Sequence, residues 1–251
     1  MDLNIILVIG IAGLFAIVMA YFSRQEGQRF ISLRPIAGYK NLANQLGRAV
    51  ESGGRLHFSL GRARLNEGES IQSLAAIKVM DRLAKDASAA ESPPTVTVGE
   101  GTLLAAAQDS LRSAFSAAGR PSNYDPSSAR FMAPQENPYV YGAGVTYVIH
   151  SEPVAGNILV GQFGPEVALM LEAGNRKDVD QVLGTNDPEA LAIGAAVTEN
   201  LLIGEEFLAS GAYLEKTSAQ IASIRAQDLF RWLAIAALVV SALLTLLGGS
   251  V

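Results

Sequence analysis

The sequence predicts an α/β fold: a mainly parallel, Rossmann-like sheet with covering helices, flanked by N- and C-terminal transmembrane helices. Four short apolar runs each end on a glycine and lead into a helix-like stretch, a pattern typical of repeated strand–helix units. Apolar segments without charge occupy both ends of the 251-residue chain. A chain of this length can bury one core of ordinary size.

The chain divides into four predicted segments. Residues 1–22 form a transmembrane helix, and residues 23–54 form a juxtamembrane linker with an amphipathic helix. Residues 55–211 form the α/β domain. Residues 212–251 contain no helix breaker before the apolar end, so one long helix is expected to continue into the C-terminal transmembrane helix.

Both apolar ends are long enough to cross a bilayer. Residues 3–22 carry no charge and, at about 1.5 Å per residue, extend about 30 Å. A cleaved signal peptide is the alternative, but this end has an Asp and no Lys or Arg before an unusually long apolar run. Residues 232–251 are also uncharged. A buried core helix is the alternative there, and we favour a membrane span.

Basic residues flank the inner ends of both spans. Arg24, Arg29, Arg34 and Lys40 follow the first span, and Arg225 and Arg231 precede the second. The positive-inside rule therefore predicts a multi-pass membrane protein whose soluble domain is cytoplasmic. Small residues on the two helices allow either their intramolecular pairing or self-association: Gly10, Gly13, Ala16, Ala237 and Ser241.

The apolar runs predict the individual elements. Strands are expected over residues 56–61, 95–99, 157–161 and 199–204, with a short one at 129–132. Helices are expected over 68–87, 102–118, 165–174 and 205–214, and one begins at Asp187-Pro188. Residues 139–161 are rich in Tyr and Val, which predicts a hairpin at a sheet edge or one long strand.

Ligands of open parallel sheets bind beyond the carboxyl ends of the strands, which here are the glycine corners. The residues just past them are Arg62, Glu100, Gln162 and Glu205. The candidate ligand-binding residues are Gly99, Glu100, Gly101, Gln162, Glu205 and Glu206.

The Gly99-Glu100-Gly101 turn is not a phosphate motif. Leu104 stands where a dinucleotide fingerprint has its third glycine, and the Lys-Ser/Thr pair of a P-loop is missing. We interpret Gly99 as supplying an unusual backbone angle and Gly101 as allowing close approach of strand and helix.

A second interpretation concerns the carboxylates at the same edge. Glu205 and Glu206, together with Glu100 and Glu166, are candidates for an acidic pocket that holds a divalent ion or an amine, or for the acid–base pair of a hydrolase. The alternative is that they stabilise helix N-termini through the helix dipole, and we prefer it.

The composition excludes several classes of site. Without cysteine there is no disulfide, thiolate nucleophile or Cys-ligated metal. His57 and His150 are the two histidines, and Ser59 is expected to face the opposite side of its strand from His57. We predict no catalytic residue, no metal site and no cofactor. The net charge of −5 and the lack of a Lys/Arg-rich run argue against nucleic acid as a partner.

Several stretches carry a resemblance over nearly the whole chain: "TVTVGEGTLLAAAQDSL", "NILVGQFGPEVALMLEAG", "DPEALAIGAAVTENLLIGEEFLASGAYLE" and "IASIRAQDLFRWL". With both apolar ends, the chain resembles a family of bacterial, Chloroflexi-type two-span membrane proteins that is known as a domain of unknown function. The resemblance implies the topology and a bacterial inner membrane, and it carries over no functional residue.

The predicted function is a membrane-anchored cytoplasmic α/β domain that acts as a non-catalytic scaffold or interaction module and self-associates. Its expected partners are the lipid bilayer, further copies of the chain and other membrane proteins. The alternative is a ligand- or nucleotide-sensing domain that uses the glycine corners, and a hydrolase is the third hypothesis.

Overall fold

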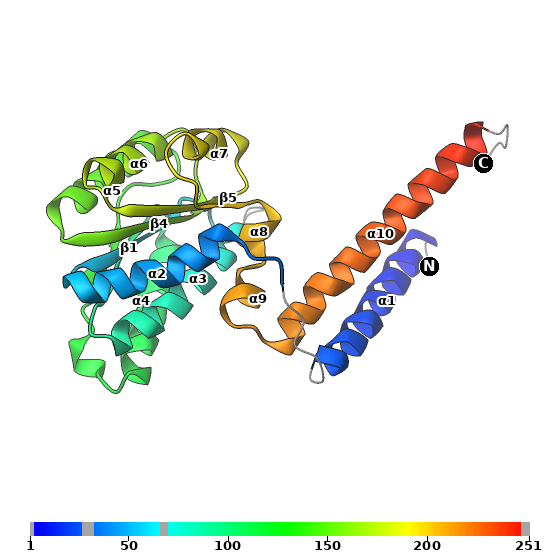
Figure 1. Ribbon diagram of the computed structural model, residues 1–251, viewed down its shortest axis with the longest axis horizontal. Helices are drawn as coiled ribbons and strands as arrows, with labels where there is room; N and C mark the ends of the chain where they lie inside the picture. The colour runs from blue at the N-terminus through cyan, green and yellow to red at the C-terminus, as the bar shows by residue number, and fades with distance from the viewer. Residues whose placement is uncertain (1–2, 27–32, 66–69, 247–251) are drawn as a thin grey trace. The chain divides into compact units, whose positions relative to one another are not determined.

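The computed structural model describes residues 3–26, 33–65 and 70–246 (Figure 1). The chain forms two compact units, one comprising Met1–Leu33 with Glu215–Val251 and the other Arg34–Leu214. The second is the α/β unit, and the first contains the two apolar helices.

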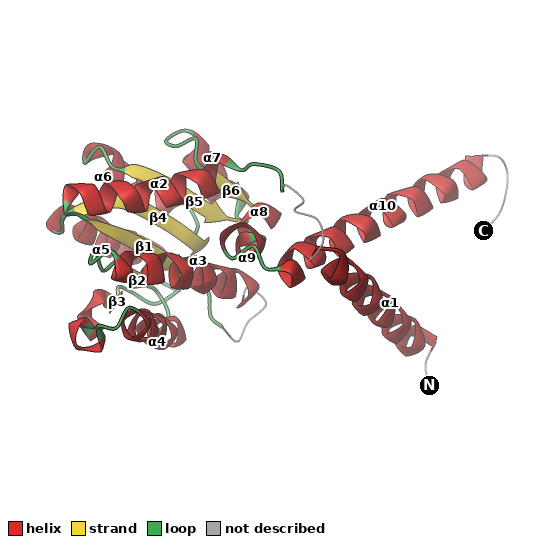
Figure 2. Cartoon of the chain, turned by 60° about the horizontal axis from the view of Figure 1, so that its bottom comes forward, coloured by secondary structure: helices red, strands yellow, loops and turns green. Residues whose placement is uncertain are grey.

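The α/β unit is built on one six-stranded parallel sheet (Figure 2). Its strands are β1 (Arg55–Gly61), β2 (Thr95–Val98), β3 (Ala129–Phe131), β4 (Val154–Gln162), β5 (Asp180–Thr185) and β6 (Leu201–Ile203). Their order in the sheet is β3-β2-β1-β4-β5-β6. This confirms the prediction of an α/β fold with a parallel sheet, and the order is that of Rossmann-type sheets.

Helices cover both faces of the sheet (Figure 1). One face carries α2 (Ala37–Ser52), α3 (Ser70–Ala89) and α4 (Gly101–Ala117), and the other carries α5 (Pro138–Ser151), α6 (Val167–Arg176) and α7 (Pro188–Ala195). The short helices α8 (Glu205–Leu208) and α9 (Ser210–Leu214) follow β6. Two 3₁₀ turns, Pro121–Asn123 and Pro126–Ser128, precede β3.

Alternation along the strands produces two separate hydrophobic cores. On β1, Leu56 and Phe58 enter the core beneath α2, α3 and α4. On β4, Ile158 joins that same core, while its neighbour Leu159 packs with α5 and α6 on the opposite face. Both faces of the sheet are therefore buried, as parallel sheets require.

Residues 138–151 form helix α5, so the prediction of a strand or hairpin there was wrong. Strand propensity suggested the hairpin, but Pro138 occupies the first helical turn, where its missing N–H costs nothing. The buried residues Tyr141, Val145 and Ile149 recur at helical spacing and pack on the sheet. Tertiary packing of one face outweighed propensity.

Strand β5 has no counterpart among the predicted strands. Gln181 lies inside it and is buried, because its side chain exchanges hydrogen bonds with Asn157 and with the backbone carbonyl of Leu171. A buried polar residue in a six-residue strand hides the apolar pattern that sequence reasoning relies on.

The long helix expected from Ala212 is divided in two. Helix α9 ends at Leu214, and α10 (Ser218–Leu246) begins four residues later. Lys216 lies between them at φ 52°, in the left-handed region that cannot continue a helix. The carbonyl of Thr217 then accepts from the backbone N–H groups of Gln220 and Ile221 to start α10.

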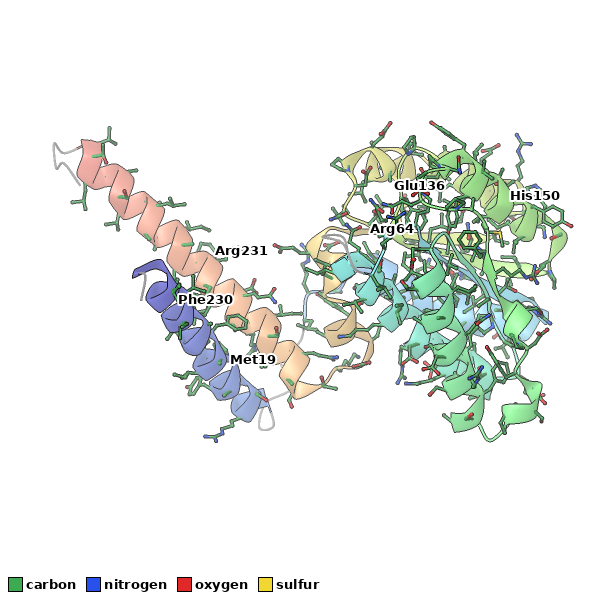
Figure 3. All side chains as sticks on the ribbon, turned by 180° about the vertical axis from the view of Figure 1, so that it is seen from behind. Met19, Arg64, Glu136, His150, Phe230 and Arg231 are labelled. Carbon is green, nitrogen blue, oxygen red and sulfur yellow. The ribbon has the colours of Figure 1, made fainter. Side chains whose placement is uncertain are left out.

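Helices α1 (Leu3–Glu26) and α10 pack side by side in the other unit. The rings of Phe15 and Phe230 are 5.6 Å apart between centroids, and the Arg225 guanidinium lies 5.9 Å from the Phe22 ring centroid. Figure 3 shows Phe230 on the side of α10 that faces α1, and Arg231 directed away from it. The pair is antiparallel, because Phe15 lies beside Phe230 and Phe22 beside the earlier Arg225.

Within the described residues, one helix is long and apolar enough to cross a membrane. It is Ser218–Leu246, and none of its most apolar window is buried. The apolar part of α1, Val8–Arg24, is shorter. The span predicted at the N-terminus therefore stays a prediction, whereas the C-terminal helix meets the criteria of length and composition.

Candidate functional site

The carboxyl edge of the sheet has its topological switch point between β1 and β4. From β1 the chain proceeds to β2 and β3 on one side, and from β4 it proceeds to β5 and β6 on the other. In open α/β sheets ligands bind just beyond the strands at this point. Arg62 follows β1, and the segment from Phe163 to Glu166 follows β4. The candidate site is therefore built from these residues.

The backbones of the strand ends meet at the switch point. The Arg62 N–H donates to the Gln162 carbonyl at 3.2 Å, and the Gly99 N–H donates to the Gly61 carbonyl at 3.0 Å. Gly61 has φ 75°, and a Cβ there would lie 2.4 Å from the Gln162 carbonyl oxygen. Only glycine tolerates both the angle and the contact. This corner is thus occupied by backbone.

A buried ion pair fills the space above the strand ends. Arg62 Nε donates to Glu166 Oε1 at 2.9 Å, and Arg62 Nη2 lies 2.8 Å from the same oxygen. The Arg62 side chain is 10% exposed and that of Glu166 is 0% exposed. The backbone N–H of Gly164 donates to both carboxylate oxygens, at 3.0 and 3.1 Å. The charge of each partner is therefore compensated within the fold.

The segment between β3 and α5 completes this arrangement. Arg62 Nη1 donates to the Gln135 carbonyl at 2.6 Å. Beside it, the Arg64 guanidinium contacts the Glu136 carboxylate at 2.7 Å, and Figure 3 shows these two side chains in the same region. Arg62 therefore joins the ends of β1 and β3 to the start of α6.

Glycines 99 and 101 have roles other than those predicted. Gly99 does not adopt a positive φ, but a Cβ there would lie 2.6 Å from Arg62 Cγ, so the glycine makes room for that side chain. A Cβ on Gly101 would meet nothing within 4 Å. Gly99 therefore lacks the unusual angle predicted for it, Gly101 lacks the predicted close approach of strand and helix, and the positive φ at this edge is at Gly61 instead.

Glu100 is the N-cap of α4. Its Oε2 accepts from the backbone N–H groups of Thr102 and Leu103, at 2.7 and 3.0 Å, and from the Thr102 hydroxyl. Burial alone raises the pKa of the Glu100 carboxyl, but these hydrogen bonds outweigh it and lower the pKa. The Glu100 carboxylate thus accepts hydrogen bonds from the N–H groups at the N-terminus of α4, in agreement with the alternative interpretation that it stabilises a helix N-terminus.

The other two carboxylates lie at the far end of the edge. Glu205 and Glu206 follow β6, which is four strand positions from β2. At about 4.8 Å per strand this separation is about 19 Å, so Glu100 does not share a pocket with them. Among the described residues, no group of three or more histidines and acidic side chains is placed to hold a metal ion.

Glu206 belongs to a cluster that we call the terminal clasp, formed by Arg34, Tyr39, Glu206 and Tyr213. Its carboxylate pairs with Arg34, and its backbone carbonyl accepts from the Tyr39 hydroxyl at 2.6 Å. The rings of Tyr39 and Tyr213 stack at 4.7 Å, and the Tyr213 hydroxyl donates to the Arg34 carbonyl at 2.9 Å. The clasp therefore ties the first residues of the α/β unit to its last ones.

The backbone and the side chain of Gln162 differ in their hydrogen bonding. Its carbonyl accepts from Arg62, whereas its side-chain Oε1 is buried and has no hydrogen-bond partner within the described part of the chain. Gln162 ends β4, as the sequence pattern predicted, but that pattern did not indicate the Arg62–Glu166 pair beside it. The local signal for this ion pair was Arg62 directly after the glycine that ends β1, but its partner Glu166 is 104 residues away in the sequence.

A row of buried polar side chains crosses the α5–α7 face of the sheet. His57 Nδ1 is 2.8 Å from Asn157 Oδ1, and Asn157 Nδ2 donates to Gln181 Oε1 at 2.9 Å. Because Asn157 donates onward through its amide, His57 Nδ1 carries the proton and Nε2 accepts from the Thr97 hydroxyl at 3.0 Å. Burial lowers the pKa of His57 to about 4. The imidazole is therefore neutral at pH 7.

Ser59 lies on the same face as His57, so the expectation that it faces the opposite side was wrong. Residues two apart on a strand share a face. The Ser59 hydroxyl pairs with the Tyr141 hydroxyl at 2.6 Å, and Tyr141 also reaches the Thr97 carbonyl at 3.3 Å. Ser59 and His57 thus engage different partners. His150 is exposed on α5, and its Nδ1 lies 2.9 Å from the Thr146 carbonyl.

Comparison with known proteins adds one finding. No curated protein and no solved structure matches the chain. The sequence model of DUF6754, a domain of unknown function, matches residues 2–251. The α/β unit and both apolar helices lie within that match. The chain therefore belongs to the DUF6754 family.

Proposed function

We propose that the protein is a membrane-anchored scaffold or interaction module that self-associates and has no catalytic activity. In this proposal α1 and α10 both lie in the bilayer of a bacterial inner membrane, and the α/β unit is cytoplasmic. The observation that carries it is the exposure of apolar side chains on both helices. Val8 is 64% exposed on α1 and Leu238 is 71% exposed on α10, so both need an apolar environment.

The faces of α1 support self-association rather than intramolecular pairing through its glycines. Phe15, Val18, Met19 and Phe22 are partly covered, at the spacing of one helix face. Gly10 and Gly13 lie away from that face, and a Cβ on either would meet nothing within 4 Å. These small residues leave α1 open to a close approach by a second helix.

The register of the helix pair also favours association between copies. Phe15 lies beside Phe230, so the part of α1 after Phe15 runs beside the segment of α10 that carries Arg225, Asp228 and Arg231. This segment precedes Trp232, which would mark the membrane boundary. Ile17 and Tyr21 then lie at the depth of the lipid headgroups, where their exposed apolar surface is not covered by α10. Because every copy of the chain carries this surface at the same depth, two copies can bury it against each other.

The carboxyl edge supports a role without catalysis. At the switch point the space is filled by Arg62 and Glu166, and at β2 the Glu100 carboxylate caps a helix. The terminal clasp brings both ends of the α/β unit together, which suits a domain held by two tethers.

The bilayer part of the proposal has a direct spectroscopic test, because Trp232 is the one tryptophan of the chain. In proteoliposomes, lipids brominated near the headgroup should quench its fluorescence more than lipids brominated deep in the acyl chain. Protease added outside intact cells should leave the α/β unit uncut. Fluorescence that neither lipid quenches, or digestion from outside, would contradict the proposal.

Self-association can be tested by single cysteines in this cysteine-free chain. Ile17→Cys should form a disulfide-linked dimer in membranes under mild oxidation. The neighbouring variant Val18→Cys is the matched control, since Val18 is on the face that α10 covers. Equal cross-linking of both variants, or none at Ile17→Cys together with a monomer in native mass spectrometry, would refute self-association through α1.

Ligand sensing is a second candidate function, and the strand order favours it. Sheets with the order β3-β2-β1-β4-β5-β6 bind nucleotides at the β1/β4 switch point. Thermal-shift measurements on the full-length protein with nucleotides and divalent cations test it. A rise in unfolding temperature that Glu100→Gln or Glu205→Gln abolishes would support ligand sensing at the glycine corners. If no nucleotide and no divalent cation shifts the unfolding temperature of the wild type, the result counts against ligand sensing.

A further inference from the structure

The Glu166 carboxylate receives hydrogen bonds from a guanidinium and from a backbone amide at the switch point. Two N–H groups of Arg62 converge on its Oε1, and the Gly164 N–H reaches both of its oxygens. A guanidinium and a backbone amide are the donors with which proteins bind free carboxylates. We call this set, the Arg62 guanidinium and the Gly164 N–H, the switch-point cradle.

The surroundings of the cradle are shaped to hold the arginine in place. Gly99 leaves room for the Arg62 side chain, and the Gln135 carbonyl accepts from its Nη1. A Cβ on Gly164 would lie 3.0 Å from Glu166 Oε2, so a glycine there keeps the carboxylate close to the backbone. Arg62 is therefore positioned by groups that do not depend on Glu166.

We propose that the switch-point cradle is a carboxylate-binding site that the protein keeps closed with its own Glu166. Glu166 lies where the sheet topology places the ligand of a Rossmann-type fold, and it occupies the position as a tethered ligand. A carboxylate-bearing ligand would compete with it for Arg62. This inference rests on the ligand-sensing candidate, and it names the position and the chemical class that such a ligand would need.

The cradle fits a carboxylate better than a phosphate. Its donors address two oxygens, the first from Arg62 and Gly164 and the second from Gly164 alone. The further oxygens of a phosphate would be desolvated without donors from these groups, at a cost in affinity. Small monocarboxylates are therefore the expected occupants when the Glu166 side chain is removed.

The test uses the full-length protein in detergent and the variant Glu166→Ala, which empties the cradle. Formate or acetate at ten times its dissociation constant should raise the midpoint of thermal unfolding of this variant by about 3–6 °C. Sodium chloride at equal ionic strength should not, and phosphate should have a smaller effect. Wild type should show no rise, because Glu166 fills the site.

Two further variants separate binding from general stabilisation. Glu166→Gln keeps the volume of the side chain, so no space opens and formate should have no effect. Arg62→Met/Glu166→Ala opens the space without the guanidinium, and its response to formate should also be lost.

The proposal is overturned if formate and acetate leave Glu166→Ala unchanged, or if this variant fails to fold with and without them. It is also overturned if wild type or the double variant responds equally. Nucleotide shifts in wild type test ligand sensing separately, so the two failures are distinguishable.

Discussion

Two arginine–glutamate pairs lie at the carboxyl edge of the same sheet in opposite environments. Arg62 and Glu166 are 10% and 0% exposed, whereas Arg34 and Glu206 in the terminal clasp are 73% and 25% exposed. The chemistry is identical, and burial makes the difference. Removing one partner of a buried pair leaves a desolvated charge, while an exposed partner returns to water.

The largest expected effect is at the buried pair. Arg62→Met leaves the Glu166 carboxylate buried without a counter-charge, so the free energy of unfolding should fall by about 3–5 kcal/mol. Thermal unfolding followed by circular dichroism should show a midpoint about 10 °C lower. Arg62→Met/Glu166→Leu removes both charges and should recover most of the loss. A double variant as unstable as the single one would show that the charge is not the cause.

The buried His57 should produce a pH dependence of nearly that size. Burial lowers its pKa from 6.5 to about 4, so between these values the unfolded chain binds a proton that the folded chain does not. Stability from this group is complete above pH 6.5 and falls by about 3 kcal/mol as the pH drops to 4. Urea unfolding of wild type and His57→Gln across this range measures it. Parallel curves would contradict the assignment.

A half-exposed carboxylate should have an intermediate effect. Glu100→Ala removes the cap of α4 and should cost about 1 kcal/mol, since two backbone N–H groups lose their acceptor. Asp187→Ala is a matched control at another helix, because Asp187 Oδ1 caps α7 through the Ala190 N–H at 2.9 Å. Similar losses would assign Glu100 a capping role, whereas a loss confined to ligand response would favour sensing.

The smallest effect is expected at the exposed pair. Arg34→Met should change the free energy of unfolding by less than about 1 kcal/mol, because the Arg34 side chain is 73% exposed and its charge is screened by salt. The difference from wild type should shrink further at high salt in the same unfolding assay. A loss as large as that of Arg62→Met would show that the terminal clasp, and not the switch point, holds the edge together.

Local sequence patterns predicted those helices and strands whose formation depends mainly on their own residues. Glycine-terminated apolar runs predicted β1, β2, β4 and β6, and Asp187-Pro188 predicted the start of α7. They were insufficient at residues 138–151 and 180–185, where helix α5 and strand β5 depend on side chains of other elements. Gln181 is tolerated inside a strand because Asn157 is beside it on β4.

The position of the candidate site could be predicted from the sequence, but the side chains that pair there could not. The sequence by itself determined that glycine corners end the strands, that Arg62 and Glu100 follow them, and that both ends of the chain are apolar. Only the tertiary structure decided that Gly99 makes room for the Arg62 side chain. It also decided that the Arg62 guanidinium pairs with the carboxylate of Glu166, which is 104 residues further along the chain. Periodicity and turn chemistry act over a few residues, whereas the partner of a buried charge is chosen by how distant strands are ordered in the sheet.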